Sequence, residues 1–137
     1  MNDQLKIDAE DRLSLLIQSQ DALKMHFLWM DRGLGFLKGR PINLPPGFVR
    51  SDDLCPVGNW LRERLDKRFL ELPLYDRTDR LHQEFHVAMD ALFSQDITRV
   101  PQPIAARFNQ VGDDLTRALE DWIALAKNHT TVMKRRN

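Results

Sequence analysis

The feature that most constrains this chain is a long stretch without proline that carries a helical pattern. Between residues 3 and 38 apolar residues recur at steps of three and four, the spacing of one face of an α-helix. These residues are Leu5, Leu13, Leu16, Ile17, Leu23, Phe27, Met30, Leu34 and Leu37. We therefore expect one long helix over residues 3–38, with Gly39 as its stop because glycine favours the position after a helix.

A proline-rich segment follows and separates this helix from a second one. Residues 39–50 hold three prolines and two glycines, a composition typical of a loop. Residues 51–53 are Ser-Asp-Asp, which favour helix starts, and Pro56 suits a first helical turn because its missing N–H is not needed there. We expect the second helix over residues 55–69.

Later prolines mark two further helices. Pro73 interrupts the pattern, and apolar residues at helical spacing then predict a third helix over residues 76–95. Pro101 and Pro103 precede a fourth, over residues 102–128. No strand pattern, internal repeat or low-complexity segment competes. The 137 residues therefore predict a single all-α domain, 1–137, folded as an antiparallel four-helix bundle.

The charge balance and apolar content restrict the partners of this domain. Lys and Arg together number 20, as do Asp and Glu, so the formal net charge is zero, which argues against a general nucleic-acid binder. No window approaches the 18 apolar residues of a membrane span. The N-terminus lacks the basic start and apolar run of a secretion signal. We therefore expect a cytoplasmic protein, which agrees with a single cysteine that can form no internal disulfide.

A short apolar run inside the first predicted helix bears on oligomerisation. Residues 25–30, MHFLWM, are apolar except for His26, and six consecutive residues cover the whole circumference of a helix. A helix that is apolar all round is buried on more than one side. Deep burial within one bundle would explain the run. A homodimer through the first helix explains it better, because a four-helix bundle rarely surrounds one of its members.

Two histidines on the third predicted helix form the strongest local motif. His82 and His86 are four residues apart and therefore share one face of a helix. A hydrolytic zinc helix would need a Glu beside one of them, but Gln83 and Phe85 occupy those places, and Glu84 lies on the other side of the helix. A di-iron site would need two Glu-x-x-His motifs, which the chain lacks.

Cys55 and His26 are the other candidate ligands. Cys55 precedes Pro56 and is predicted at a helix N-terminus, where the partial positive charge favours the thiolate. Taken alone, Cys55 is explained equally well as a small buried cysteine, and a lone histidine such as His26 on an apolar stripe is more often a satisfied core residue than a ligand. Together, His26, Cys55, His82 and His86 make the four ligands that a tetrahedral Zn²⁺ site prefers. His129 lies in the basic terminal stretch and is given no role.

Three motifs follow one another along the chain: His26 with Leu28 and Trp29, then Cys55-Pro-Val57-Gly58-Asn-Trp60, then His82-x-x-x-His86. This order and spacing resemble the chemoreceptor zinc-binding (CZB) domain family. The resemblance implies a four-helix bundle, often dimeric, with a zinc site of one Cys and three His. Such domains accompany bacterial chemoreceptors and diguanylate cyclases and are implicated in sensing zinc or oxidants such as hypochlorous acid.

These observations predict a non-enzymatic sensory or regulatory domain that binds Zn²⁺ and acts with a signalling protein in trans. One alternative is a structural or adaptor bundle in which zinc only holds the fold. A third possibility is a metalloenzyme in which substrate takes the place of Cys55. Asp79 and Asp90 share the ligand face of their helix, so either carboxylate is a candidate to orient a zinc-bound imidazole.

Overall fold

The computed structural model describes residues 7–44, 49 and 55–127, and these residues form helices and no strand. The elements are α1 (Ala9–Leu37), α2 (Pro56–Asn59), a π-helical turn η3 (Trp60–Arg64), a 3-10 helix η4 (Lys67–Glu71), α3 (Pro73–Phe93) and α4 (Gln102–Lys127). The predicted all-α class is confirmed.

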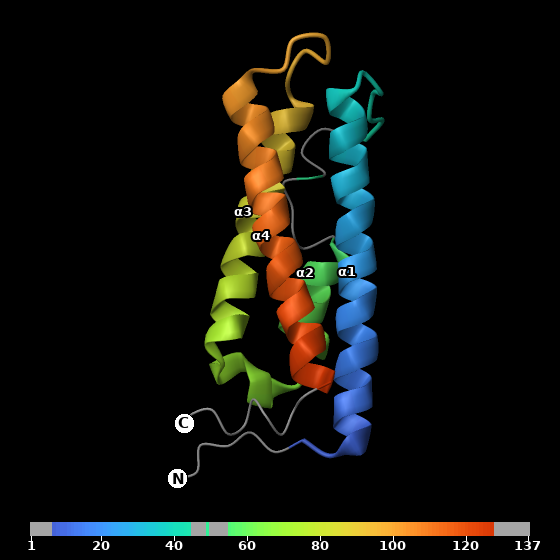
Figure 1. Ribbon diagram of the computed structural model, residues 1–137, viewed down its shortest axis with the longest axis vertical. Helices are drawn as coiled ribbons and strands as arrows, with labels where there is room; N and C mark the ends of the chain where they lie inside the picture. The colour runs from blue at the N-terminus through green and yellow to red at the C-terminus, as the bar shows by residue number, and fades with distance from the viewer. Residues whose placement is uncertain (1–6, 45–48, 50–54, 128–137) are drawn as a thin grey trace.

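The helices run alternately up and down, as Figure 1 shows. The long helices α1 and α3 run in one direction and α4 returns between them, packing along both. The fourth member of the bundle is the short descending segment of α2 and η3, and α2 contacts both α1 and α3. The predicted antiparallel four-helix bundle is therefore confirmed, with one member much shorter than the other three.

The ends of α1 follow from its capping residues. Asp8 is the N-cap and its carboxylate accepts a hydrogen bond from the backbone N–H of Asp11 at 2.8 Å. At the other end Gly39 has φ 94°, and the backbone N–H of Arg40 donates to the carbonyl of Gly35 at 2.8 Å, as in a Schellman motif. The predicted stop at Gly39 is confirmed, while residues 3–6 lie outside the described part.

The expectation of one continuous helix over residues 55–69 is wrong. The helical turns end at Arg64, Leu65 is extended with ψ 134°, and Asp66 starts the separate helix η4 by accepting a hydrogen bond from the backbone N–H of Arg68 at 2.9 Å. Asp66 favours this break because a short acidic side chain caps a new turn. Pro73 follows a break at the extended Leu72, as predicted, but α3 begins at Pro73 and not at residue 76, because the missing N–H of proline is tolerated at the first helical position.

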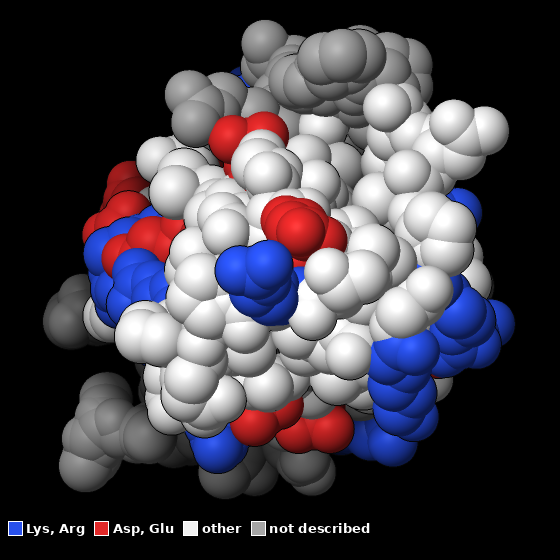
Figure 2. All heavy atoms as spheres, turned by 90° about the horizontal axis from the view of Figure 1, so that it is seen from above, with Lys and Arg blue, Asp and Glu red and all other residues white. Residues whose placement is uncertain are grey.

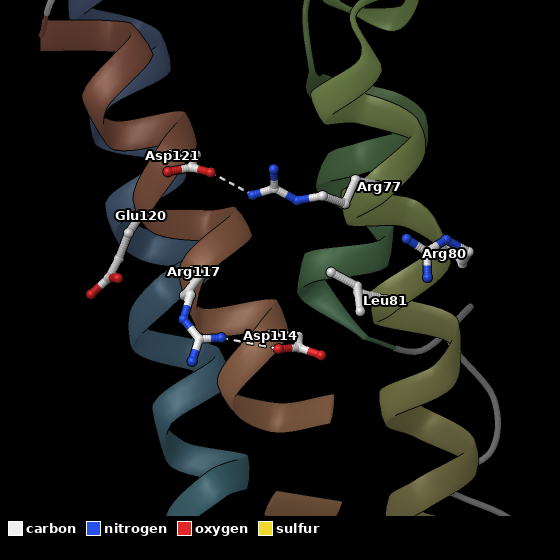
Figure 3. Close-up of a pocket in the computed structure, with 7 residues that line it drawn as sticks. All are labelled: Arg77, Arg80, Leu81, Asp114, Arg117, Glu120 and Asp121. Atoms are coloured by element: carbon white, nitrogen blue, oxygen red, sulfur yellow. Dashed lines mark hydrogen bonds and ion pairs between the residues drawn. The ribbon is translucent and has the colours of Figure 1, made fainter. Parts of the chain in front are cut away.

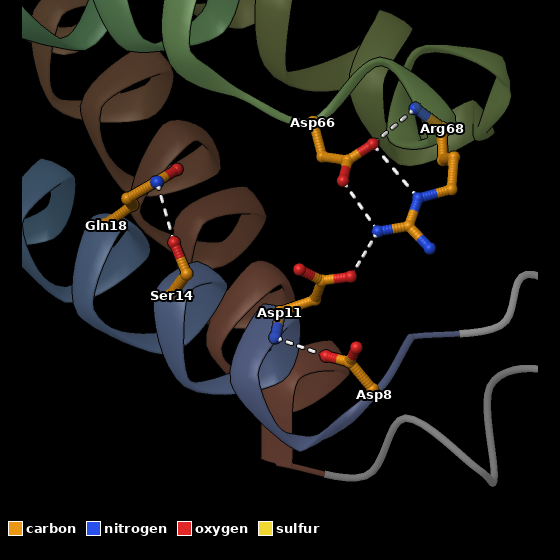
Figure 4. Close-up of polar contacts among 6 residues, drawn as sticks. All are labelled: Asp8, Asp11, Ser14, Gln18, Asp66 and Arg68. Carbon is orange, nitrogen blue, oxygen red and sulfur yellow. Dashed lines mark hydrogen bonds and ion pairs between the residues drawn. The ribbon is translucent and has the colours of Figure 1, made fainter.

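An ion-pair cluster joins η4 to the start of α1 (Figure 4). The guanidinium of Arg68 donates to Asp66 at 2.6 Å and to Asp11 at 2.5 Å. These hydrogen bonds raise the pKa of Arg68 and lower that of Asp66. All three side chains are more than a third exposed, so the pairs contribute little to stability and mainly fix the position of η4.

An aromatic cluster packs around Trp122 in the core. Trp60 and Phe69 both meet Trp122 edge to face, each with ring centroids 5.8 Å apart. The indole N–H of Trp122 donates to the hydroxyl of buried Thr78 at 2.8 Å, and that of Trp60 donates to Gln18 at 2.8 Å. The polar atom of each buried indole is therefore satisfied, as large amphipathic rings in a core require.

Glycines let α1 and α4 approach each other closely. A Cβ on Gly33 would lie 2.0 Å from the Phe108 ring, and one on Gly112 would lie 2.3 Å from the sulfur of Met30. Both distances are far below van der Waals contact. Gly33 therefore serves close packing between the two helices.

The apolar pattern of α1 covers more than its buried face. The buried face holds Leu15, Ala22, His26, Trp29 and Phe36. On other sides of the helix, five large apolar side chains are exposed: Leu13, Ile17, Phe27, Leu28 and Leu34. Within residues 25–30, His26 and Trp29 are buried, whereas Phe27 and Leu28 are 48% and 52% exposed. The apolar run therefore does not reflect deep burial within one bundle.

The end of the bundle where α1 ends carries charges of both signs. Figure 2 shows this end, with Lys or Arg and Asp or Glu side chains next to each other near its centre, among uncharged ones, and more of both kinds at its edges. Within the described residues, no helix has the length and apolar character that crossing a membrane requires.

Candidate metal centre

Cys55, His82 and His86 converge in the core of the bundle. Cys55 is the N-cap residue of α2, and the two histidines lie one turn apart on α3. The Nε2 atom of His82 lies 3.4 Å from the Sγ of Cys55 and 3.1 Å from the Nε2 of His86. One ligand atom from each of the three residues lies within 4.8 Å of the other two. Together they can hold a metal ion.

The spacing of these atoms suits a tetrahedral ion. Bond lengths of zinc to nitrogen and sulfur place two ligand nitrogens about 3.3 Å apart and a nitrogen and a sulfur about 3.6 Å apart. The observed separations of 3.1 Å and 3.4 Å are each slightly shorter. These two pairs therefore lie close to the separations that a tetrahedral ion needs, and the ligand atoms of Cys55 and His86 lie within 4.8 Å of each other.

The site is closed to solvent. The exposed fractions are 7% for Cys55, 2% for His82 and 4% for His86. The three side chains line a cavity of about 10 Å³, close to the smallest that holds one water molecule. The other residues around it are His26 and the apolar Trp29, Val57, Phe85, Met89 and Leu115. Low dielectric around the ligands strengthens any interaction with an ion.

A backbone carbonyl orients the ring of His86. Its Nδ1 lies 2.5 Å from the carbonyl oxygen of Val49, which can only accept a hydrogen bond, so Nδ1 carries the proton. The lone pair of neutral His86 is therefore on Nε2, the atom that faces His82. Metal-bound histidines commonly donate their second N–H in this way.

His26 lies beside this group and lines the same cavity, but it is not one of the three residues whose ligand atoms cluster. Its Nε2 lies 2.9 Å from the carbonyl of Gly112 and 2.9 Å from the hydroxyl of Thr116. Its Nδ1 is buried and has no hydrogen-bond partner. Of the four ligands predicted from sequence, the structure brings three together and places the fourth at the edge of their cavity.

Burial keeps the imidazoles of His82 and His26 neutral. Burial, together with smaller effects of the neighbouring His86, Arg62 and His26, lowers the pKa of His82 to about 3. Burial also lowers the pKa of His26 to about 4, against the opposing effects of the Gly112 carbonyl and of Asp113. Neutral rings are the form that binds metal, so the apolar surroundings favour ligation at neutral pH.

The carboxylates considered for orienting the ligands do not orient His82. The Nδ1 of His82 has no hydrogen-bond partner, which excludes Asp79 and Asp90 as its acceptors. Asp79 instead accepts a hydrogen bond from Gln83 at the surface. Backbone carbonyls take this role for His86 and His26. Sequence cannot reveal such contacts because every residue has a carbonyl.

Glu84 faces away from the site, as predicted. Its carboxylate pairs with Arg80 at 3.4 Å and with Arg107 at 3.6 Å. No glutamate of His82-Gln83-Glu84-Phe85-His86 therefore serves the cluster as a base. His129 lies outside the described residues.

A larger hollow lies on the surface between α3 and α4 (Figure 3). It measures about 610 Å³ and is lined by three arginines and three acidic residues. Arg77 pairs with Asp121 across the helices, and Arg117 pairs with Asp114 at 3.0 Å. Since these charges neutralise each other, the hollow has no marked preference for an anion or a cation.

Compared with known proteins, the chain matches no family model, no curated protein and no solved structure. Its class therefore rests on its own fold and site. They define an all-α bundle with a buried Cys/His₂ cluster that can hold a metal ion.

Proposed function

We propose that this protein is a zinc-binding sensory or regulatory domain of the chemoreceptor zinc-binding type. The observation that carries the proposal is the buried convergence of Cys55, His82 and His86. Three such side chains seldom cluster in a core without a structural or functional role, because buried polar atoms normally have hydrogen-bond partners.

Zn²⁺ is the ion that fits this ligand set best. Thiolate and imidazole ligands suit it better than they suit Mg²⁺ or Ca²⁺, which prefer oxygen. Cys55 at the N-terminus of α2 favours the thiolate that zinc requires. One thiolate and three neutral imidazoles leave a net charge of about +1 on the centre.

His26 is the fourth ligand in this proposal. It lines the cavity of the other three, and its Nδ1 is a buried atom that lacks a partner. Ligation through Nδ1 would satisfy that atom and complete a tetrahedral set. It requires the His26 ring and the other ligands to draw together when the ion binds.

A site closed by four protein ligands leaves no position for a catalytic water, so its role is regulatory and the domain is not an enzyme. Two signals can act on it. Loss of zinc removes the link between α1, α2 and α3. Alternatively, hypochlorous acid transfers its OH to the Cys55 thiolate and leaves as chloride, and the resulting sulfenic acid is a poorer ligand.

A homodimer through α1 would transmit the change. Leu13, Ile17 and Leu28 are exposed on the side of α1 away from its buried face, and exposed apolar side chains gathered on one element are typical of interaction surfaces. A second copy, and through it a signalling protein in the cytoplasm, would respond to altered packing of α1.

A structural zinc is the runner-up. It is supported by the position of the site, which joins three segments of the bundle in its core. A structural site would unfold when stripped of zinc, whereas a sensory site would exchange zinc or respond to oxidant while the helices stay folded.

The test is metal content of protein purified without added metal. We expect one zinc per chain in the wild type and in the control His129→Ala, and a reduced content in Cys55→Ala, His86→Ala and His26→Ala. A folded wild type with no zinc would contradict the proposal. Zinc release by hypochlorous acid, lost in Cys55→Ser, would then favour the sensory role over the structural one.

A further inference from the structure

We infer that Thr116 and the carbonyl of Gly112, both on α4, position His26 so that its Nδ1 is the metal-binding atom. Through this contact α4, which supplies none of the four proposed ligands, responds to metal occupancy. The inference rests on the proposed zinc site and assigns a positioning residue, Thr116, that is remote from the ligands in sequence.

The hydrogen bonds around His26 determine its tautomer. The Gly112 carbonyl can only accept, so the Nε2 of His26, at 2.9 Å, must donate to it. The Thr116 hydroxyl gives its single proton to the same carbonyl, also at 2.9 Å. Its oxygen therefore accepts from the Nε2–H of His26 at 2.9 Å. These three hydrogen bonds can form together only when His26 carries its proton on Nε2.

The other ring nitrogen is then prepared for an ion. With the proton on Nε2, the lone pair of neutral His26 is on Nδ1. This atom is buried and without a hydrogen-bond partner, in a ring that lines the cavity of Cys55, His82 and His86. His86 has the opposite arrangement, because the Val49 carbonyl takes its Nδ1 proton. Two backbone carbonyls thus select different donor atoms in the two rings.

Close packing of α1 on α4 makes this contact possible. A side chain on Gly112 would meet Met30, which follows His26 by one helical turn and lies near the same face of α1. Glycine at this position allows α1 to approach, so that the imidazole reaches the carbonyl. A rigid ring that binds metal on one side and α4 on the other transmits displacement from the ion to α4.

The first test compares zinc affinity among variants by competition with a chromophoric chelator. Thr116→Val keeps the shape but removes the hydroxyl, and we expect affinity to fall about tenfold, as for other groups that orient metal ligands. Thr116→Ser restores the hydroxyl and is expected to stay within about twofold of the wild type. Equal affinities in all three proteins would overturn the inference.

Thr78→Val is the matched control. Thr78 is a buried threonine that donates to the carbonyl of Leu74 and accepts from Trp122, the same bonding pattern without a histidine. We expect this variant to lose thermal stability but keep the zinc affinity of the wild type. If Thr78→Val weakened zinc binding as much as Thr116→Val, the effect would be general destabilisation, and the inference would fail.

Nitrogen-15 NMR of His26 in the wild type supplies a second test that needs no variant. We expect the Nε2–H tautomer in the metal-free protein and a shift of the Nδ1 resonance when zinc is added. A Nδ1–H tautomer, or a zinc-induced shift confined to Nε2, would refute the assignment while leaving the zinc site itself intact. Absence of any zinc binding would instead overturn the proposed function, and this inference with it.

Discussion

The Nε2 atoms of His82 and His86 lie 3.1 Å apart on successive turns of α3. Because His86 uses its Nδ1 proton on the carbonyl of Val49, its Nε2 presents a lone pair to His82. Without an ion, His82 can donate its Nε2 proton to that lone pair. An ion between the rings uses both Nε2 lone pairs.

Zinc should therefore stabilise the folded protein. A ligand at a hundred times its dissociation constant adds about 2.7 kcal/mol to the free energy of unfolding, which for a domain of this size raises Tm by roughly 8–10 °C. We expect this rise in thermal scans of the wild type and a much smaller one in His86→Gln. A wild-type Tm that does not change with zinc would contradict the prediction.

The metal-free protein should lose stability as the pH falls. Folded His26 and His82 have pKa values of about 4 and about 3, whereas the unfolded chain takes up both protons near pH 6.5. Between these values the unfolded state binds more protons, so the free energy of unfolding falls with decreasing pH. The contribution of His26, about 3 kcal/mol, is complete above pH 6.5 and lost as the pH drops through 4.

Urea unfolding at pH 7 and pH 5 with a chelator present measures this effect. The wild-type midpoint should be clearly lower at pH 5. His26→Asn, which cannot take up the proton, should show a smaller difference between the two pH values. An identical pH dependence in the two proteins would exclude His26 as a source of it.

Gly33→Ala should destabilise the bundle. The new methyl group would lie 2.0 Å from the ring of Phe108, which is fully buried. Overpacking of this kind costs about 1–3 kcal/mol, more than the roughly 1 kcal/mol that alanine gains in helix propensity. Gly35→Ala is the control, because its methyl group would meet only the end of the Arg40 side chain, which can move. If both variants unfold at the same urea concentration, the Phe108 contact has no effect on stability.

A charge on the outer face of α1 should prevent self-association. Ile17 and Leu28 are each about half exposed, so Ile17→Glu and Leu28→Glu should fold normally but convert a dimer to a monomer. Val87→Glu on α3 is the control, since Val87 is 60% exposed on another helix. Light scattering gives the mass of each protein. A wild type that is monomeric at high concentration would refute the dimer.

The helices and the metal cluster could largely be predicted from sequence because they depend on local periodicity. The spacing of His82 and His86 determines that they share a face, and Pro56 places Cys55 at a helix start. The break at Leu65 was missed because capping by Asp66 overrides the apolar pattern. The sequence could not identify which side of α1 is buried, because large apolar residues occur on several sides of this helix.

The alternating course of the helices has a topological consequence. An even number of passes returns the chain to its starting level, so the first turn of α1 and the last turn of α4 lie at the same end of the bundle (Figure 1). A circular permutant that joins this end through a linker and opens between α3 and α4 would preserve the spatial arrangement of the ligands and place α4 before them in the chain instead of after them. Zinc affinity in such a permutant would reveal whether the site depends on connectivity or only on the packed helices.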